Sequence, residues 1–348
     1  MSNTRFFLGS NTPVGYRHTA ATLYDPADGW RVYLLKGGAG SGKSTLLRRI
    51  AAQDNDAELF LCSADPASLD GVRLSGRRVL VLDATAPHAV EPQYWGACER
   101  LVSLPADNER LYADRDRIRD LSDRCAALHV TARRQLAAAA TAQTEWERVL
   151  RPLVDTAAIA AFAHRLAQTE WDVQPIDGKH ERRFLTALTP DGIRPLFETA
   201  QALCPRLFVL VDEGGLASLL LSKLHREAEA AGMTALISPS VLFPDRIDQL
   251  LLPTIGTAFL TSNDQTVVDF PVYRRIHLSR FLSDGVLSEH RNRRHLWKRT
   301  VDECVNDAAI AAGEAKAVHD ELETVTAAAA DWRAVQRLGD DLLTDIFG

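Results

Sequence analysis

Short apolar runs alternate with stretches of helical periodicity along most of the chain. In the first half these runs lie at residues 32–35, 58–62 and 79–83, and a Leu-rich stretch follows the first of them. Short continuous apolar runs between helices are typical of buried parallel strands. The pattern therefore predicts an α/β core in this half.

The same order of elements returns in the second half. Residues 5–15 and 182–192 share the skeleton R-x-F-L-x-x-x-T-P-x-G, and apolar runs follow at 207–211, 234–238 and 257–261. Because residue identities, order and spacing agree, we interpret the chain as an internal duplication.

Each core runs into a long segment with a heptad-like spacing of apolar and small residues, at 107–170 and 289–346. Positions one heptad apart are Leu111, Ile118 and Cys125 in the first segment and Val301, Ala308, Ala315 and Leu322 in the second. This spacing predicts long, closely packed helices. Two interpretations stay open: the segments pack on each other as bundle cores, or they form arms that grip a protein partner, with a homodimer as one form.

Composition narrows the classes of protein that fit. With 348 residues, 46% hydrophobic and 25% charged, the chain suits about two globular domains. A net charge of −6 argues against nucleic-acid binding. The five cysteines form no C-x-x-C pair, which favours reduced thiols. We expect a cytoplasmic protein, because the N-terminus does not resemble a signal peptide and no run approaches the roughly 18 apolar residues of a membrane span.

The clearest chemical signal is GGAGSGKS at residues 37–44, which fits G-x-x-x-x-G-K-[ST] between a strand and a helix. Its glycines let successive N–H groups face phosphates. Lys43 would meet the β- and γ-phosphates, and the Ser44 hydroxyl would bind Mg²⁺. The predicted cofactor-binding residues are Gly37, Gly38, Ala39, Gly40, Ser41, Gly42, Lys43, Ser44 and Thr45.

Asp83 ends the third apolar run and is the second predicted Mg²⁺ ligand, because a carboxylate at the end of a buried strand needs a nearby cation. The alternative is that Asp83 caps the next turn. No glutamate follows to polarise water, so Thr85 and His88 are the nearest substitutes and Glu91 is a further one. The predicted catalytic residues are Lys43, Asp83, Thr85 and His88.

The stretch 62–72 is expected to be a loop at the carboxyl edge of the sheet, where ligands bind in open α/β folds. Asp65 and Asp70 would contact a ligand there or cap helices. Cys62 is interpreted as a small buried residue rather than a nucleophile.

The second copy has no P-loop. Residues 211–218 read VDEGGLAS, so the lysine and the hydroxyl at the magnesium position are expected to be missing and two carboxylates would repel a triphosphate. We predict that this half binds no nucleotide in the P-loop manner. It would instead contribute an arginine to the γ-phosphate, from Arg194, Arg206 or Arg246.

The first half resembles a bacterial family of duplicated P-loop proteins, known as ATPases or ATP-binding proteins of unknown role. The resemblance rests on F-L-G-S-N-T-P-V-G-Y, GGAGSGKST, C-S-A-D-P-A-S-L-D-G-V and D-A-T-A-P-H-A-V-E-P. It is strong over residues 5–105 and faint over 182–280. It implies the fold and nucleotide binding, and no substrate. Leu61 stands where the family commonly has a histidine, and the second P-loop is lost.

The predicted fold class is α/β, with tandem P-loop NTPase-like parallel-sheet cores and long helical segments. The predicted units are a nucleotide-binding core (1–106), a helical segment (107–172), a degenerate repeat (173–288) and a C-terminal helical segment (289–348). The predicted function is a slow or regulated ATPase with one Mg²⁺·ATP site, adenine being favoured because no N-K-x-D motif occurs. The alternatives are a small-molecule or nucleotide kinase and a nucleotide-gated interaction module with little hydrolysis.

Overall fold

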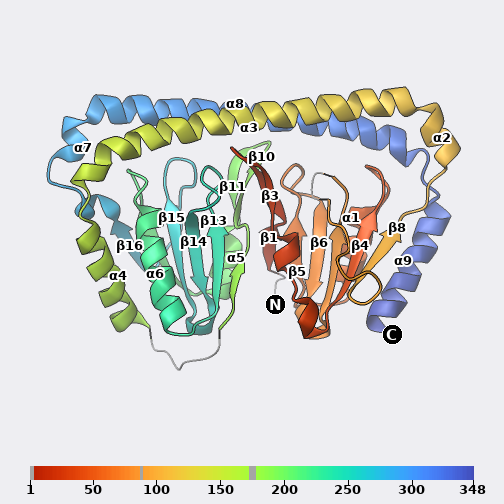
Figure 1. Cartoon of the computed structure of the whole chain (residues 1–348), viewed down its shortest axis with the longest axis horizontal. Helices are drawn as coiled ribbons and strands as arrows, with labels where there is room; N and C mark the ends of the chain where they lie inside the picture. The colour runs from red at the N-terminus through yellow and green to blue at the C-terminus, as the bar shows by residue number, and fades with distance from the viewer. Residues whose placement is uncertain (1–3, 87–88, 172–177) are drawn as a thin grey trace.

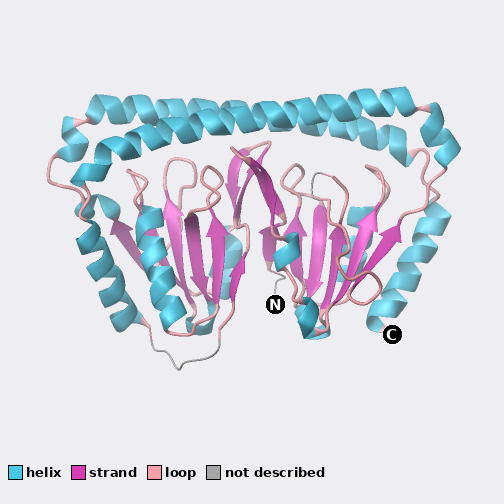
Figure 2. Ribbon diagram, in the orientation of Figure 1, coloured by secondary structure: helices cyan, strands magenta, loops and turns pink. Residues whose placement is uncertain are grey.

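The protein is described by a computed structural model over residues 4–86, 89–171 and 178–348. Within these residues the chain forms two six-stranded sheets that lie side by side beneath two long helices (Figure 1, Figure 2). The long helices are α3 (Arg115–Leu150) and α8 (Arg291–Ala327). The predicted α/β fold class and the duplication are confirmed.

The first sheet has the strand order β1-β5-β6-β7-β4-β8. Its strands are β1 (Arg5–Phe7), β4 (Arg31–Lys36), β5 (Glu58–Leu61), β6 (Leu69–Leu74), β7 (Val79–Asp83) and β8 (Glu99–Ser103). β4 lies between β7 and β8 and is parallel to both. The carboxyl ends of these strands therefore meet at one edge, where the P-loop motif and Asp83 also lie.

The second sheet repeats this order as β9-β13-β14-β15-β12-β16. Its strands are β9 (His180–Arg182), β12 (Arg206–Val211), β13 (Ala235–Pro239), β14 (Ile247–Leu252), β15 (Thr257–Ser262) and β16 (Arg274–His277). Each half also carries a short hairpin, formed by β2 (Gly9–Thr12) and β3 (Gly15–His18), or by β10 (Thr186–Thr189) and β11 (Gly192–Pro195).

Each sheet contains an antiparallel strand that the sequence did not predict. The stretch 62–72, expected to be a loop, contains the start of β6, which runs antiparallel to β5 and β7. An Asp-Gly pair and an arginine interrupt the apolar pattern of this strand, so its periodicity gives no strand signal. Gly71 packs closely there, because a Cβ would lie 2.7 Å from the end of the Leu82 side chain, which would have to move.

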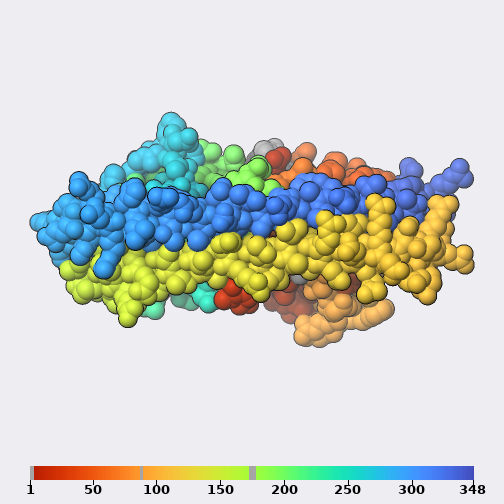
Figure 3. Space-filling model, turned by 90° about the horizontal axis from the view of Figure 1, so that it is seen from above, coloured from red at the N-terminus to blue at the C-terminus, as the bar shows by residue number. Residues whose placement is uncertain are grey.

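The two long helices run in opposite directions and form a continuous layer across both halves (Figure 1, Figure 3). Leu121 packs with Val318 and Val325 near one end of the pair. Farther along, small residues bring the helices close together, and the Cys125 thiol lies 3.6 Å from the Ala315 carbonyl oxygen. The two helical segments therefore pack on each other, which is the first of the two interpretations of their sequence.

The helices that follow this pair cross to the opposite half. α4 (Thr156–Glu170) comes from the first half and packs on α6 (Ala217–Ala230), beside the second sheet. α9 (Trp332–Phe347) comes from the second half and packs on the first sheet, where its Leu342 and Ile346 join the core. The remaining helices are α1 (Lys43–Ala51), α2 (Asn108–Ala113), α5 (Phe197–Leu203) and α7 (Val286–Glu289). Segments that are continuous in sequence are therefore divided between the two spatial units.

The two halves meet at equivalent residues of the repeat. The Phe7 N–H donates to the Phe184 carbonyl oxygen at 2.9 Å, and one hydrophobic core includes side chains from both sheets. Arg183 is 1% exposed at this seam and pairs with Glu58 and Glu181. In the described part of the chain, no helix is long and apolar enough to span a membrane.

Candidate functional site

The P-loop motif forms a tight turn between β4 and α1. β4 is buried from Val32 to Leu35, and α1 begins at Lys43, directly after the loop. Gly40 and Gly42 have φ angles of 65° and 95°, which residues with a Cβ rarely adopt. The backbone of this turn therefore requires the glycines of the motif.

The Lys43 side chain bends back over the loop. Its Nζ donates to the carbonyl oxygens of Gly37 and Gly38, at 2.8 Å each, and lies 3.6 Å from Asp83 Oδ2. The side chain is only 9% exposed, so these acceptors compensate the burial of its charge. The ammonium group is thereby held between the loop and the carboxyl end of β7.

The turn gathers donors that no protein group uses. Within the described ranges, the backbone N–H groups of Lys43, Ser44 and Thr45 have no protein acceptor. The first N–H groups of a helix, together with its dipole, favour an anion. The Ser41 hydroxyl in the same loop is buried and also has no partner among the described residues. These donors fit an anionic ligand.

Asp83 and Thr85 tie the end of β7 to the loop. Asp83 Oδ1 accepts a hydrogen bond from the Thr85 N–H at 2.9 Å, and the Thr85 hydroxyl donates to the Gly37 carbonyl oxygen at 3.2 Å. In this arrangement Asp83 caps its own turn through one oxygen while the other faces Lys43. Both predicted roles of Asp83 are therefore compatible with the geometry.

The other predicted site residues lie at different places around the loop. The Ser44 hydroxyl accepts a hydrogen bond from the Leu69 N–H at 3.0 Å, which holds it against the start of β6. His88 lies outside the described residues. Glu91 pairs with Lys36, with Nζ and Oε1 2.6 Å apart, at an exposed position. The positions that form the turn itself are Gly37, Gly38, Ala39, Gly40, Ser41 and Gly42.

The residues that follow β5 include Cys62, Asp65 and Asp70, whose surroundings differ from those of the P-loop residues. Burial, and then the Asp70 carboxylate, raise the pKa of the Cys62 thiol. The thiol is therefore neutral, although Cys62 is half-buried and not fully buried as expected. Asp65 accepts a hydrogen bond from the Ser68 hydroxyl at 2.8 Å and closes a turn. Asp70 lies within β6, so neither aspartate caps a helix.

The second half covers the outer side of the P-loop, a contact that the sequence did not predict. The Thr326 hydroxyl, at the end of α8, donates to the Ala39 carbonyl oxygen. A Cβ at Gly40 would lie 2.8 Å from the Glu323 carbonyl oxygen, and one at Gly42 would lie 3.2 Å from the Trp332 ring. The helical spacing predicted α8 itself, but no local signal indicated which loop its end would meet.

In the second half, a carboxylate fills the equivalent loop. Asp212 accepts hydrogen bonds from the N–H groups of Gly214 at 3.1 Å, Leu216 at 2.9 Å and Ala217 at 2.9 Å. Of these donors, the Ala217 N–H corresponds to the available N–H of Lys43, because α6 begins at Ala217 as α1 begins at Lys43. The loop is thus closed by its own side chain, a more direct obstacle to phosphate than the repulsion that we expected.

One detail of the second loop corrects the sequence prediction. α6 begins at Ala217 as α1 begins at Lys43, so Ser218 occupies the position of Ser44. The hydroxyl at the magnesium position is therefore retained. The prediction was wrong because the second loop is shorter by one residue, which shifts the alignment after it. The lysine is absent in either alignment.

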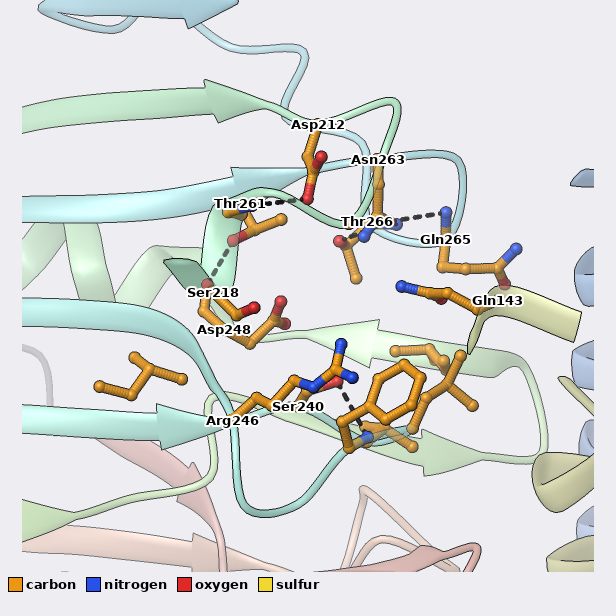
Figure 4. A pocket seen from close by; sticks show the side chains of 17 residues that line it. Gln143, Asp212, Ser218, Ser240, Arg246, Asp248, Thr261, Asn263, Gln265 and Thr266 are labelled. Atoms are coloured by element: carbon orange, nitrogen blue, oxygen red, sulfur yellow. Dashed lines mark hydrogen bonds between the residues drawn. The ribbon is translucent and has the colours of Figure 1, made fainter. Parts of the chain in front are cut away.

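A pocket of about 70 Å³ lies beside this closed loop (Figure 4). Burial, and then the Asp212 carboxylate, raise the pKa of Asp248 in this pocket to about 7. Arg246 also lines it and pairs with Glu147 of α3, with Nη1 and Oε1 2.8 Å apart. The other labelled polar residues of the lining are Gln143, Ser218, Ser240, Thr261, Asn263, Gln265 and Thr266.

The three arginines proposed to reach the γ-phosphate lie elsewhere. Arg246 lines the pocket beside the closed loop of the second half. Arg206 contacts Thr257 and the Glu170 carbonyl oxygen at the amino end of β12. Arg194 lies on β11. In the arrangement described, none of the three contacts the P-loop.

The comparisons with known proteins add no assignment: no family model matches the chain, and neither do curated proteins or solved structures. The resemblance to duplicated P-loop ATPases therefore stays a prediction.

Proposed function

We propose that the chain is an ATP-binding P-loop NTPase with a single Mg²⁺·ATP site in its first half, acting as a slow or regulated ATPase. The observation that carries the proposal is the arrangement of Lys43, which is anchored on the loop carbonyls beside Asp83. The available N–H groups of the turn and the unpartnered Ser41 hydroxyl support it.

Each residue of the site has a role in this proposal. The loop N–H groups and Lys43 would bind the β- and γ-phosphates, and the Ser44 hydroxyl and Asp83 would hold Mg²⁺. When bound, Mg²⁺ would neutralise charge on the phosphate oxygens. Thr85 would keep the end of β7 against the loop, through its contact with the Gly37 carbonyl oxygen.

A second candidate is a nucleotide-gated interaction module with little hydrolysis. It is favoured by the contact of Thr326 and Trp332 with the loop, because a ligand that moves the loop would also move the end of the long helical layer. A phosphotransferase is the remaining alternative, motivated by the absence of a glutamate after Asp83.

The proposal is tested by titrating the purified chain with MgATP and MgGTP and measuring stoichiometry and phosphate release. We expect one MgATP per chain, and Lys43→Ala should abolish binding because the loop then lacks its cation. Lys179→Ala is the matched control, since Lys179 pairs with Asp28 at the surface.

Micromolar MgATP binding by the Lys43→Ala variant would overturn the site assignment. Two nucleotides per chain would contradict the closed second loop. Binding without phosphate release would favour the gated module over the ATPase.

A further inference from the structure

Trp332, the first residue of α9, exposes part of its aromatic ring beside the P-loop. A Cβ at Gly42 would lie 3.2 Å from this ring and 3.6 Å from the Val335 side chain, one turn further along α9. The ring therefore lies against the loop backbone, directly before the start of α1. The residue is nevertheless 50% exposed. A single exposed aromatic residue is ordinary on a protein surface, but this one lies at the edge of the proposed ligand site.

The junction between α8 and α9 holds Trp332 in this place. The Asp331 N–H donates to the Pro105 carbonyl oxygen at 3.3 Å, and the Asp107 N–H donates to the Ala329 carbonyl oxygen at 2.7 Å. These bonds tie the start of α9 to the segment after β8, the strand that pairs with β4. Contacts within the protein therefore fix the backbone that carries the ring, which lowers the entropy cost of binding a ligand against it.

The second half has the same helix start without the aromatic ring. Asp155 caps α4 as Asp331 caps α9, because each side chain accepts a hydrogen bond from the N–H three residues further on, at 2.8 Å and 3.0 Å. α4 then begins at Thr156, as α9 begins at Trp332. The ring is thus present in the half whose loop has available donors. A small polar side chain replaces it in the half whose loop is closed by its own carboxylate.

The loop distinguishes the two ends of the proposed ligand. Lys43, which would meet the β- and γ-phosphates, is only 9% exposed, so that end of the triphosphate lies on the buried side of the loop. Thr45, two residues further along α1, is exposed. The nucleoside therefore leaves the loop on its exposed side, and Trp332 lies against the outer side of the same turn.

From this placement we infer that Trp332 stacks on the base of the bound nucleotide. The inference rests on the proposed MgATP site. The indole ring supplies a flat apolar face, and stacking removes apolar surface of both rings from water. Every base has a π-face, so this contact tolerates any base. Trp332 therefore adds affinity for a nucleoside triphosphate over inorganic tripolyphosphate, and it does not select between adenine and guanine.

The experiment titrates the full chain with MgATP, MgGTP and magnesium tripolyphosphate, which has the phosphates without the nucleoside. We expect Trp332→Ala to weaken MgATP and MgGTP binding about tenfold, in the range for the loss of one base–aromatic stack, and to weaken tripolyphosphate binding less than about twofold. Trp332→Phe keeps an aromatic face and should retain most of the nucleotide affinity. Thr156→Ala, at the equivalent position of the second half, is the matched control and should change none of the three affinities.

Tryptophan fluorescence is a second measurement that needs no alanine variant. A base stacked on an indole ring quenches its emission, so the wild-type emission should fall as MgATP binds and stay constant as tripolyphosphate binds. Trp332→Phe should bind MgATP without this quenching, although the other tryptophans of the chain remain.

Equal weakening of all three ligands by Trp332→Ala would overturn the inference, because it assigns the ring to support of the loop. Unchanged MgATP affinity in that variant, or quenching that persists in Trp332→Phe, would also overturn it. In each of these cases the wild-type chain still binds MgATP, so the proposed function stands. A wild-type chain that binds neither MgATP nor tripolyphosphate removes the proposed function, and the inference falls with it.

Discussion

At the residue scale, Lys43 and Asp212 give the two equivalent loops opposite electrostatics. Lys43 leaves the N–H groups of its loop available and adds a positive charge beside them. Asp212 instead accepts hydrogen bonds from N–H groups of its own loop, among them that of Ala217, which has the position of Lys43. The second loop is therefore occupied by its own carboxyl group, whereas the donors at the start of α1 remain available in the first.

The raised pKa of Asp248 leads to a prediction about stability and pH. A folded-state pKa of about 7 against an unfolded value near 4 means that the folded state binds this proton more tightly. The stabilisation that this bound proton gives the folded state is complete below about pH 4. It is lost as the pH rises to about 7, and the free energy of unfolding falls by on the order of 1 kcal/mol per pH unit.

Urea unfolding of wild type and Asp248→Asn between pH 4.5 and 7.5 measures this effect. The wild type should lose stability relative to the variant as the pH rises across this range. A constant difference between the two would show that Asp248 has no such pKa.

At the element scale, the helical layer depends on small residues between α3 and α8. Ala315 is 1% exposed, and its carbonyl oxygen contacts the Cys125 thiol. Interiors are packed too densely to accept additional methylenes without strain. The same helix ends at the P-loop, where the Thr326 hydroxyl donates to the Ala39 carbonyl oxygen. The packing of the layer therefore also positions the site.

We predict that Ala315→Leu lowers the free energy of unfolding by about 1–3 kcal/mol, because the larger side chain would separate the two helices. Ala317→Leu, on the exposed face of α8, is the control and should change stability little. Equal urea midpoints for the two variants would contradict the observed packing.

At the scale of the whole molecule, the crossing of α4 and α9 joins the two halves. α9 belongs to the second half of the chain, yet its Asp345 accepts a hydrogen bond from the Tyr33 hydroxyl of β4 at 2.7 Å. The shared hydrophobic core at the seam reinforces this connection. Each half therefore takes part of its stability from the other.

Leu342→Ala should lower the free energy of unfolding by about 2–5 kcal/mol, because it opens a cavity in the core of the first sheet. Hydrogen exchange should accordingly accelerate in β4 and α1, which precede the mutation by about 300 residues of sequence. Gln336→Ala, at an exposed position of α9, should leave exchange there unchanged. Faster exchange confined to α9 would show that the helix does not support the first half.

The sequence by itself determined the elements whose signals are local. The strand, the glycine turn and the helix of the P-loop are adjacent in the chain, and positive φ angles at Gly40 and Gly42 are encoded by the glycines themselves. The same holds for the apolar strands β4 and β7 and for the two long helices, whose periodicity extends over many residues. The repeat skeleton likewise revealed the duplication.

Only the tertiary structure decided how distant segments meet. β6 lacks an apolar pattern and becomes a strand because β5 and β7 offer hydrogen bonds on both sides. That pairing places Gly71 opposite Leu82, next to the end of β7 that carries Asp83. Similarly, heptad spacing predicts that a helix packs but not against what, so neither the crossing of α4 and α9 nor the contact of Thr326 with the P-loop followed from it. These features depend on packing between residues far apart in the chain, which no local pattern records.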